Sequence, residues 1–203
     1  MARPNAGTKG VPRLDRESQI LEIASAQFGT LGFAATSVAA IAEKAGISKP
    51  LIYNYFGSKE GLYEACLDRG GAIVAEEIER IARGDAVGIE RGMQTLGGMF
   101  TLLEPQPYLW RLFFDPTAPT TGPIADSVTL YADRIGKLAE EGVAELMALA
   151  GNSDELDVSA MTTVWLGIVD SLMGWWLDHP NETADQMIQR CMRLLEALFG
   201  DHG

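Results

Sequence analysis

The sequence predicts an all-α protein of about nine helices. Apolar residues recur at helical spacing from residue 14 almost to the end of the chain, and no alternating strand pattern of useful length interrupts them. Glycines and prolines fall between the periodic segments, where helices end. The chain has 203 residues, of which 47% are hydrophobic and 22% charged, which suits one large or two small globular domains.

Four of these helices are predicted in the first 83 residues, after an arm at 1–13 that we expect to be disordered because it is rich in Gly, Pro and charge. The first helix should end at Gly32. Its buried side carries four apolar residues, Leu21, Ala24, Phe28 and Leu31. The later helices should be capped in turn by Thr36 or Ser37, by Ser48 and by Ser58, and the fourth should run to Arg83.

Five further helical segments are predicted at 86–104, 106–114, 124–150, 154–178 and 182–199. They are separated by Pro105 and Pro107, by the loop DPTAPTTGP at 115–123, by Gly151 and by Pro180. The predicted domains are therefore the arm at 1–13, a first domain at 14–60 and a second at 61–203.

The second and third helices have the layout of a helix-turn-helix, with Gly46 in the turn. Six apolar residues should form its core against Phe28 and Leu31, namely Val38, Ile41, Ala42, Ile47, Ile52 and Phe56. The third helix then leaves outside that core Lys49, Pro50, Leu51, Tyr53, Asn54 and Tyr55. A three-helix subdomain with solvated polar residues is the alternative, but it gives the exposed aromatic side chains no purpose.

The exposed residues are of the types that read DNA. Lys49 can donate to guanine O6 or N7, Asn54 can pair with an adenine edge or a phosphate, and Leu51 can touch a thymine methyl. Hydroxyl groups of Tyr53, Tyr55 and of Thr36 or Ser37 can bond phosphate oxygens. Lys59 follows the Ser58 cap, so its charge and the dipole of the fourth helix both suit a phosphate.

Residues 33–62 fit the pattern FxxTSVxxIAxxAGISxxxIYxYFxSKExL, which resembles the N-terminal signature of the TetR family of transcriptional regulators. The resemblance covers about residues 14–62. It implies an all-α dimer in which three N-terminal helices bind DNA and a larger C-terminal domain binds a small ligand. Ser48, Lys49, Pro50, Leu51 and Asn54 match groove-facing positions of the family. Tyr53, Tyr55 and Lys59 match phosphate-contacting positions, and Tyr55 stands where the family often has His.

The charge distribution favours one DNA-binding face on an acidic protein. The whole chain has a net charge of −12. Residues 1–60 hold seven Lys or Arg against five Asp or Glu, a balance of +2, and the remainder holds nine against 23, a balance of −14. A mildly basic end on an acidic body suits a protein that offers DNA that end alone.

The segments 154–178 and 182–199 are apolar on more than one helical face. One interpretation is a single thick core within a monomer. The other is a homodimer in which these two helices pair with their copies in a four-helix interface. A dimer would place two recognition helices on the half-sites of a palindromic operator, roughly 34 Å apart.

A small-molecule site is predicted from flexible methionines beside large aromatic residues in the middle helices. Its predicted lining is Met93, Leu96, Met99, Phe100, Leu103, Trp110, Phe114, Tyr131 and Trp165. Ordinary core packing is the alternative for each of them. Gly97 and Gly98, in mid-helix, would let a ligand or another helix approach closely.

No catalytic motif is present, and neither His179 nor His202 has partners at metal-ligand spacing. We expect no enzyme activity, no cofactor and no metal. Cys66 and Cys191 fall on apolar stripes, which predicts buried, reduced thiols. Without an apolar leader at residues 1–13 or a run approaching the roughly 18 apolar residues of a membrane span, the expectation is a cytoplasmic protein. The acidic run Glu76, Glu77 and Glu79 should be a solvated face.

Together these observations predict a homodimeric regulator of transcription, most simply a repressor that a small, largely apolar effector releases from its operator. Two alternatives stay open. One is an activator or architectural DNA-binding protein without a small-molecule effector. The other is a helical protein-interaction module that has lost DNA binding.

Overall fold

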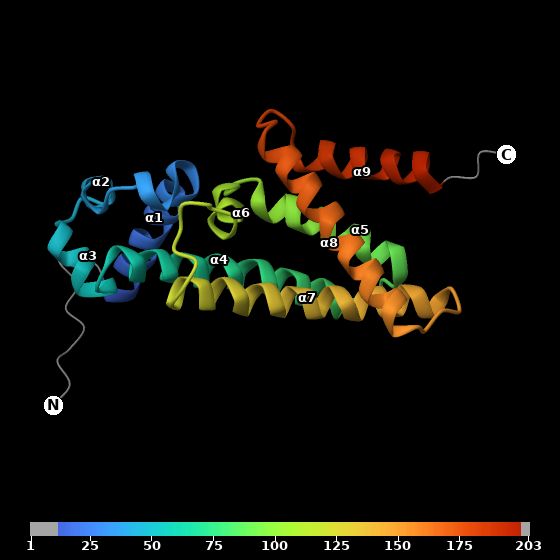
Figure 1. Ribbon diagram of the computed structural model, residues 1–203. Coiled ribbons are helices and arrows are strands. Elements are labelled where there is room, and N and C mark those ends of the chain that lie inside the picture. Colours follow the sequence, from blue (N-terminus) through green and yellow to red (C-terminus); the bar gives the residue numbers. More distant parts are fainter. Residues whose placement is uncertain (1–11, 200–203) are drawn as a thin grey trace. The chain divides into compact units, whose positions relative to one another are not determined.

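The fold was analysed in a computed structural model that describes residues 12–199, with side chains described for 12–197. These residues form helices and no strand (Figure 1), as the sequence predicts. The helices are α1 Arg13–Ala35, α2 Val38–Lys44, α3 Lys49–Phe56, α4 Lys59–Ala82, α5 Gly88–Leu103, α6 Tyr108–Phe113, α7 Pro123–Leu149, α8 Glu155–Leu177 and α9 Ala184–Phe199. The predicted arm lies outside the described residues except for Pro12 and Arg13.

The helix ends follow from local chemistry. At Gly32 the backbone has φ of 80°, so the helical conformation of α1 is interrupted where predicted. The Ser37 hydroxyl caps α2 by accepting from the Ala39 amide at 3.2 Å, and the Ser58 hydroxyl accepts from the Gly61 amide at 3.0 Å at the start of α4. Ser48 occupies the N-cap position of α3, as predicted, but its side chain makes no capping bond.

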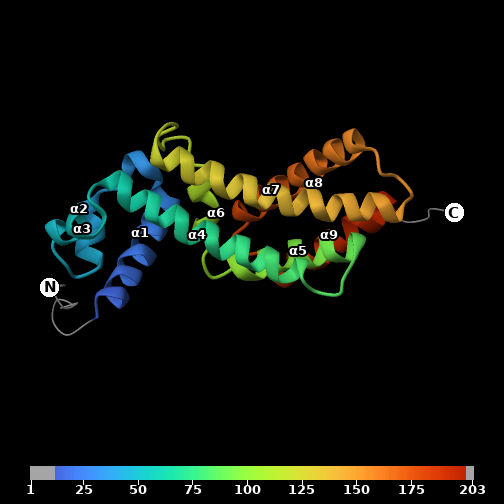
Figure 2. The same cartoon turned by 90° about the horizontal axis from the view of Figure 1, so that it is seen from below.

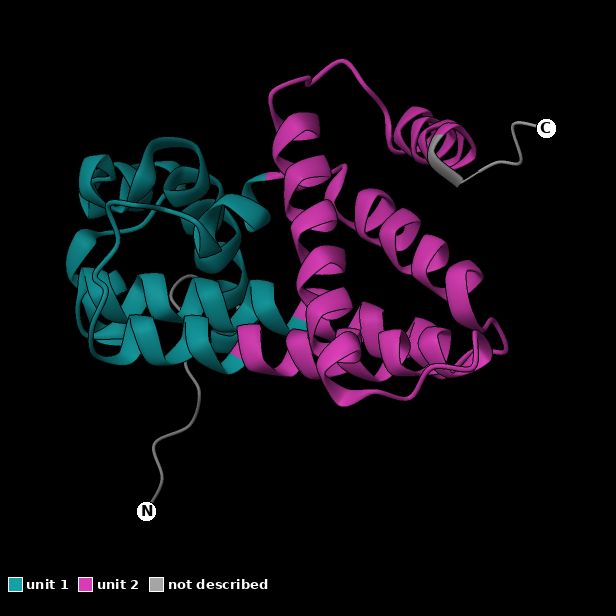
Figure 3. Cartoon of the chain, turned by 45° about the vertical axis from the view of Figure 1, so that its right-hand side comes forward, with its two compact units in different colours: residues 1–72, 108–130 teal, residues 73–107, 131–203 magenta. Residues whose placement is uncertain are grey.

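The chain divides into two compact units (Figure 3). Unit 1 comprises residues up to Ala72 together with Tyr108–Leu130, and unit 2 comprises Ile73–Pro107 together with the chain from Tyr131. The predicted boundary between residues 60 and 61 does not match these units. Helical periodicity gave no sign that residues 108–130 would pack with the N-terminal helices, because it carries no information on which distant helices meet.

In unit 1, α6 packs closely on α1 at Gly29 and also lies against α4. A Cβ atom at Gly29 of α1 would overlap the carbonyl oxygen of Tyr108. A Cβ atom at Gly70 of α4 would lie 3.5 Å from the Leu109 side chain. The buried hydroxyl of Tyr63 in α4 donates to the Leu112 carbonyl oxygen at 2.7 Å. α6 is therefore held by close backbone approach and by a buried hydrogen bond.

In unit 2, α5 packs on α9 (Figure 2). A Cβ atom at Gly97 would lie 3.3 Å from Ile188 of α9, and one at Gly98 would lie 2.6 Å from Ile81 of α4. The two glycines thus admit neighbouring helices, which is one of the two roles predicted for them. Phe100 of α5 also meets the Trp176 ring of α8 edge to face, with ring centroids 5.2 Å apart.

The acidic run in α4 is not simply a solvated face. Glu79 forms ion pairs with Arg134 of α7 at 2.6 Å and with Arg83 at 3.5 Å. Glu77 is paired with Arg80 at 2.7 Å, and both glutamates are only partly exposed. The prediction holds for Glu76 alone, because Arg134 is too distant in the sequence for its approach to Glu79 to be read from spacing.

Helix α8 is long and apolar enough to cross a membrane by length and composition alone, with 11% of its most apolar window buried. The expectation that no segment approaches a membrane span is therefore wrong for α8. One such helix is weak evidence for a span. The same exposed apolar surface is what the predicted homodimer requires.

We predict opposite effects on stability for two Gly→Ala substitutions. Gly29→Ala should lower the free energy of unfolding by about 1–3 kcal/mol, because the new methyl group meets the Tyr108 backbone, which cannot rotate away. Gly136→Ala in α7 has open space around its Cβ atom and should raise that free energy by up to about 1 kcal/mol. Urea unfolding followed by circular dichroism measures both. Equal effects of the two variants would contradict the close packing of α6 on α1.

Candidate nucleic-acid interface

The helix-turn-helix is held by a small apolar core. Val38, Ile41 and Ala42 of α2 and Ile52 of α3 are buried, and Ile47 and Phe56 are half-buried. Gly46 has φ of 63°, a conformation that glycine adopts without strain, and it lets the chain turn between the two helices. The predicted core is thus present, and Phe28 of α1 is buried as expected, so Leu31 is the only predicted member that is absent from it.

Leu31 does not join that core, because its side chain is 53% exposed. The break at Gly32 redirects the chain, and Phe33 is the residue that turns inward. The Phe33 ring centroid lies 5.2 Å from that of Tyr63 and 6.1 Å from that of Phe28. The prediction for Leu31 is wrong because it continued the helical stripe to a residue next to the break.

The side chains predicted to meet DNA remain largely outside the core of α3. Ser48, Lys49, Pro50, Tyr53 and Asn54 are exposed. Leu51 and Tyr55 are half-buried. The Lys49 ammonium lies 5.5 Å from the centroid of the Tyr53 ring, one helical turn further along α3. α3 therefore combines on one short helix the donors and apolar groups expected of a recognition helix.

Thr36 is not available for a phosphate. Its side chain is 3% exposed, and its hydroxyl donates to the Gly32 carbonyl oxygen at 2.7 Å and lies 3.2 Å from that of Gln27. Thr36 closes the broken end of α1 instead, which corrects its predicted role. Ser37 is exposed, and its hydroxyl caps α2, so of the two residues Ser37 alone stays a candidate.

Lys59 is the first residue of α4, where the positive end of the helix dipole and the ammonium group act together. Its Nζ atom lies 4.5 Å from the Phe33 ring centroid and donates to the Ala34 carbonyl oxygen at 3.4 Å. The packed stem holds the charge at the helix end, where a phosphate would be bound.

A loop more than 80 residues away in the sequence closes the break in α1. The Asp115 carboxylate accepts from the Phe33 amide, and the Thr117 hydroxyl accepts from the Ala34 amide at 3.1 Å. Asp115 also accepts from the amide and hydroxyl of Thr117, at 2.9 and 2.7 Å. We call these four residues, Phe33, Ala34, Asp115 and Thr117, the Asp115 latch. It satisfies the two amides at the start of the short turn that follows the break at Gly32, where amides lack partners within the helix.

The latch changes the pKa values of neighbouring groups. Burial works to raise the pKa of the Asp115 carboxyl, but the hydrogen bonds from Thr117 and Phe33 outweigh it and hold that pKa below its ordinary value. Burial, and next the charge of Asp115, raise the pKa of Tyr63, so its hydroxyl remains a donor. Asp115 is therefore a charged acceptor at neutral pH.

Both cysteines are free and buried, as predicted. Burial raises the pKa of the Cys66 thiol to about 12, against smaller opposing effects of Ser25 and Arg69, and burial also raises the pKa of Cys191. A thiol that stays protonated at neutral pH is a poor nucleophile. The two cysteines act as small apolar residues.

The predicted ligand-binding residues do not form one group within a single unit. Trp110 and Phe114 belong to unit 1, with ring centroids 5.1 Å apart and Phe114 57% exposed. The others belong to unit 2. There Leu96, Met99, Phe100 and Leu103 are buried, while Met93, Tyr131 and Trp165 are half-buried. The unit 2 members stay candidates for a ligand site, and the exposure of Phe114 argues against its predicted role.

Helix α8 is apolar on two sides, as predicted. One side is buried within unit 2, through Val158, Val169, Met173 and Trp176. Another is exposed, at fractions of 39%, 54%, 43% and 38%, and carries Met161, Val164, Ile168 and Trp175. α9 likewise exposes Met192 and Leu194. We call these six exposed apolar residues, Met161, Val164, Ile168, Trp175, Met192 and Leu194, the α8–α9 face.

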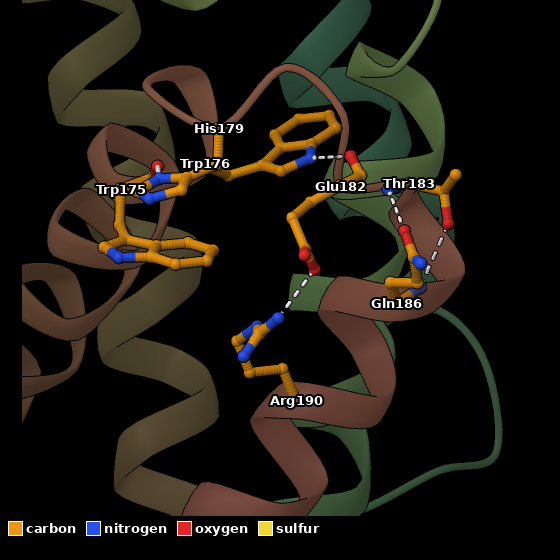
Figure 4. Close-up of polar contacts among 7 residues, drawn as sticks. All are labelled: Trp175, Trp176, His179, Glu182, Thr183, Gln186 and Arg190. Carbon is orange, nitrogen blue, oxygen red and sulfur yellow. Dashed lines mark hydrogen bonds and ion pairs between the residues drawn. The ribbon is translucent and has the colours of Figure 1, made fainter.

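The end of the α8–α9 face is held in place by stacking and charge (Figure 4). The His179 ring lies 3.7 Å from the Trp175 ring centroid, and the Arg190 guanidinium lies 4.9 Å from it. Glu182 pairs with Arg190 at 2.7 Å, and the Trp176 indole donates to the Glu182 carbonyl oxygen at 2.7 Å. Trp175 is therefore an exposed aromatic side chain with restricted freedom, a combination typical of protein interfaces.

Comparison with known proteins finds a family match for the N-terminal helices. Residues 20–66 match the family model described as bacterial regulatory proteins, tetR family. The HTH-type transcriptional activator FasR of Mycolicibacterium smegmatis is 30% identical over 134 residues, which are 64% of this chain and 61% of FasR. The chain thus matches about three-fifths of the length of this curated relative.

Solved structures share the fold over nearly the whole chain. A transcriptional regulator FadR from Bacillus subtilis, in complex with stearoyl-CoA, has a TM-score of 0.74 and 19% identity, covering 91% of this chain and 99% of that one. A TetR-like transcriptional regulator from Rhodococcus sp. RHA1 has a TM-score of 0.64 and 27% identity, covering 91% and 98%. Both likenesses extend well beyond the helix-turn-helix.

We predict that the Asp115 latch stabilises unit 1. Asp115→Asn removes the charge and one acceptor, and should lower the free energy of unfolding by about 1–3 kcal/mol at pH 7. Asp133→Asn, on an exposed turn of α7, is the control and should change it by less than about 0.5 kcal/mol. Urea unfolding measures both.

The difference between wild type and Asp115→Asn should depend on pH. The pKa of Asp115 is lower in the folded protein, so its contribution is present above the unfolded value of about 3.9 and is lost as pH falls through the folded value. A difference that persists unchanged at low pH would show that the carboxylate charge is not what holds the latch.

Proposed function

Because the chain belongs to the TetR family of transcriptional regulators, we propose that it binds operator DNA as a homodimer and that a small, largely apolar effector releases it. The observation that carries this proposal lies in α3. Within the segment that matches the family model, α3 leaves Lys49, Tyr53 and Asn54 exposed on a helix fixed by a buried core. The family consists of regulatory proteins, in line with the expectation that the chain is not an enzyme.

The proposed contacts divide by chemistry. Lys49, Leu51 and Asn54 would read base edges in the major groove, with Ser48 and Pro50 at the entrance of α3. Ser37, Tyr53, Tyr55 and Lys59 would bind phosphates and set the register of α3. The first group determines which operator is chosen, and the second determines how strongly any duplex is bound.

Effector release would operate through α4. This helix contributes Lys59–Ala72 to unit 1 and Ile73–Ala82 to unit 2, so it is covalently shared by the DNA-binding unit and the proposed sensing unit. A ligand bound among the candidate residues of unit 2 would tilt α4 and change the spacing of the two recognition helices. Linkage requires that such a ligand and the operator weaken each other's binding.

The effector class is supported by the apolar character of the candidate residues of unit 2. FadR from Bacillus subtilis is described in complex with stearoyl-CoA, a molecule with a long apolar chain, but at 19% identity that likeness shows the fold alone. The acidic balance of residues 61–203 disfavours a strongly anionic effector. The proposed effector is therefore a small, largely apolar molecule.

One relative favours a second candidate function. FasR, 30% identical over 134 residues, is a transcriptional activator. The same helix-turn-helix would then recruit transcription rather than block it, and the DNA contacts proposed above would be unchanged. Transcription in vitro from a template that carries the bound operator distinguishes the two, because a repressor lowers the transcript and an activator raises it.

Salt-dependent binding to DNA is the first expected outcome. Affinity for any duplex should fall steeply between about 50 and about 200 mM salt, because bound counterions are released on binding. Lys59→Ala should weaken binding to all sequences alike and reduce the slope of log K against log salt by about 0.9 for each protomer bound. Lys137→Ala, an exposed site on α7, removes the same charge and serves as the control.

Gel shift and fluorescence anisotropy, on fragments selected from genomic DNA, provide these measurements. If wild type binds no duplex in a salt-sensitive way, the chain is a helical interaction module rather than a DNA-binding regulator. If binding is normal and Lys59→Ala has the slope of wild type, the phosphate role of Lys59 is wrong while the function stands.

Self-association through the α8–α9 face is the second expected outcome. Ile168→Glu places a charge in the middle of this face and should weaken dimerisation by at least about 30-fold, the size expected at an interface hot spot. Ile89→Glu in α5, an exposed apolar site outside this face, should leave dimerisation unchanged. Sedimentation velocity measures both, and a monomeric wild type would overturn the homodimer.

A further inference from the structure

Arg13, which the sequence assigned to the N-terminal arm, belongs to α1 and touches the recognition helix. It is the first residue of α1, and its guanidinium lies 5.3 Å from the centroid of the Tyr55 ring. Arg13 is exposed, so its guanidinium can stack on Tyr55 and still donate to a group outside the protein. No ion pair within residues 12–197 involves Arg13, so no described carboxylate neutralises its charge.

The two tyrosines of α3 point to different sides of the helix. Successive residues of an α-helix are about 100° apart, so Tyr55 lies about 200° around α3 from Tyr53. Lys49, four residues before Tyr53, shares its side and lies over its ring. Arg13 lies over the ring on the other side. α3 is therefore flanked by one cation–aromatic pair on each side, and one of the two cations comes from α1.

A helix in the major groove has a phosphate backbone along each side, across a groove about 12 Å wide. With α3 in the groove, Tyr53 faces one wall, and Tyr55 with Arg13 faces the other, while Lys49 beside Tyr53 stays free to reach a base edge. We propose that Arg13, held by Tyr55, binds a backbone phosphate on that second wall and thereby fixes the angle at which α3 enters the groove. This inference rests on the proposed DNA-binding function.

Arg13 is on this account a positioning residue. A phosphate contact carries no base information, so the substitution of Arg13 should weaken binding to every sequence alike. Asp15 and Glu17 follow Arg13 on the same helix, so this end of α1 is not basic as a whole. The proposed phosphate contact therefore depends on how Tyr55 holds the Arg13 guanidinium. Arg16, the next basic residue of α1, is bonded to Gln19 instead and has no such contact.

The test uses the full chain with Arg13→Gln and a fluorescein-labelled DNA duplex of mixed sequence. The slope of log K against log salt should fall by about 0.9 for each protomer bound. If the contact contributes nothing at 1 M salt, affinity per protomer should fall about 15-fold at 50 mM and about four-fold at 200 mM. Arg13→Lys keeps the charge and should keep the slope. Arg83→Gln, on a 78% exposed side chain at the end of α4, is the matched control and should behave as wild type.

The slope separates a phosphate contact from a structural role. If Arg13→Gln only reduced the fraction of folded protein, every apparent affinity would fall by the same factor. The slope of log K against log salt would then stay unchanged. Arg13→Gln that lowers thermal stability or affinity but keeps the wild-type slope would therefore overturn the inference. So would Arg13→Gln indistinguishable from wild type. Absence of salt-sensitive binding by wild type would instead overturn the proposed function.

Discussion

The Asp115 latch is the contact on which the geometry of the N-terminal helices depends. Gly32 ends the regular part of α1, and the amides of Phe33 and Ala34 would remain unpaired without Asp115 and Thr117. Gly32 has φ of 80°, which favours glycine, and a Cβ atom there would crowd the Thr117 hydroxyl at 3.1 Å. With the break closed, Phe33 is placed on Tyr63 and under Lys59.

Aromatic packing carries this local arrangement to the interface. Tyr63 of α4 contacts Phe28 and Phe33 of α1 edge to face, and its hydroxyl bonds the end of α6. The same α4 begins at Lys59, the proposed phosphate-binding residue. The position of the Lys59 ammonium thus follows from the buried Tyr63 ring and from Asp115. The helix-turn-helix is supported by α1, α4 and α6, and not by its own short core alone.

Much of the fold could be predicted from the sequence because the signals that define a helix lie in residues close together in the chain. The ends of α5 to α9 follow from glycine and proline, and the exposed set on α3 follows from spacing. What failed depends on distant parts of the chain. Leu31 was misjudged because the helical stripe was continued up to the break at Gly32, and Thr36 because its hydroxyl bonds back to the carbonyl oxygens of α1. No local pattern reveals the loop at Asp115 as the partner of this break. The contact of Arg13 with Tyr55 was missed because it joins residues from different helices.

The loop that carries Asp115 also determines when, during synthesis, the N-terminal helices can reach their final arrangement. Residues 13–60 leave the ribosome first, yet the amides after Gly32 have no partner until residues 115–117 have also emerged. The stretch that resembles an autonomous N-terminal domain therefore waits for a contact made across more than 80 residues, which makes it slower to settle than its local helices suggest. A chain cut after α4 would keep every proposed DNA-contacting residue and lose the support beneath them.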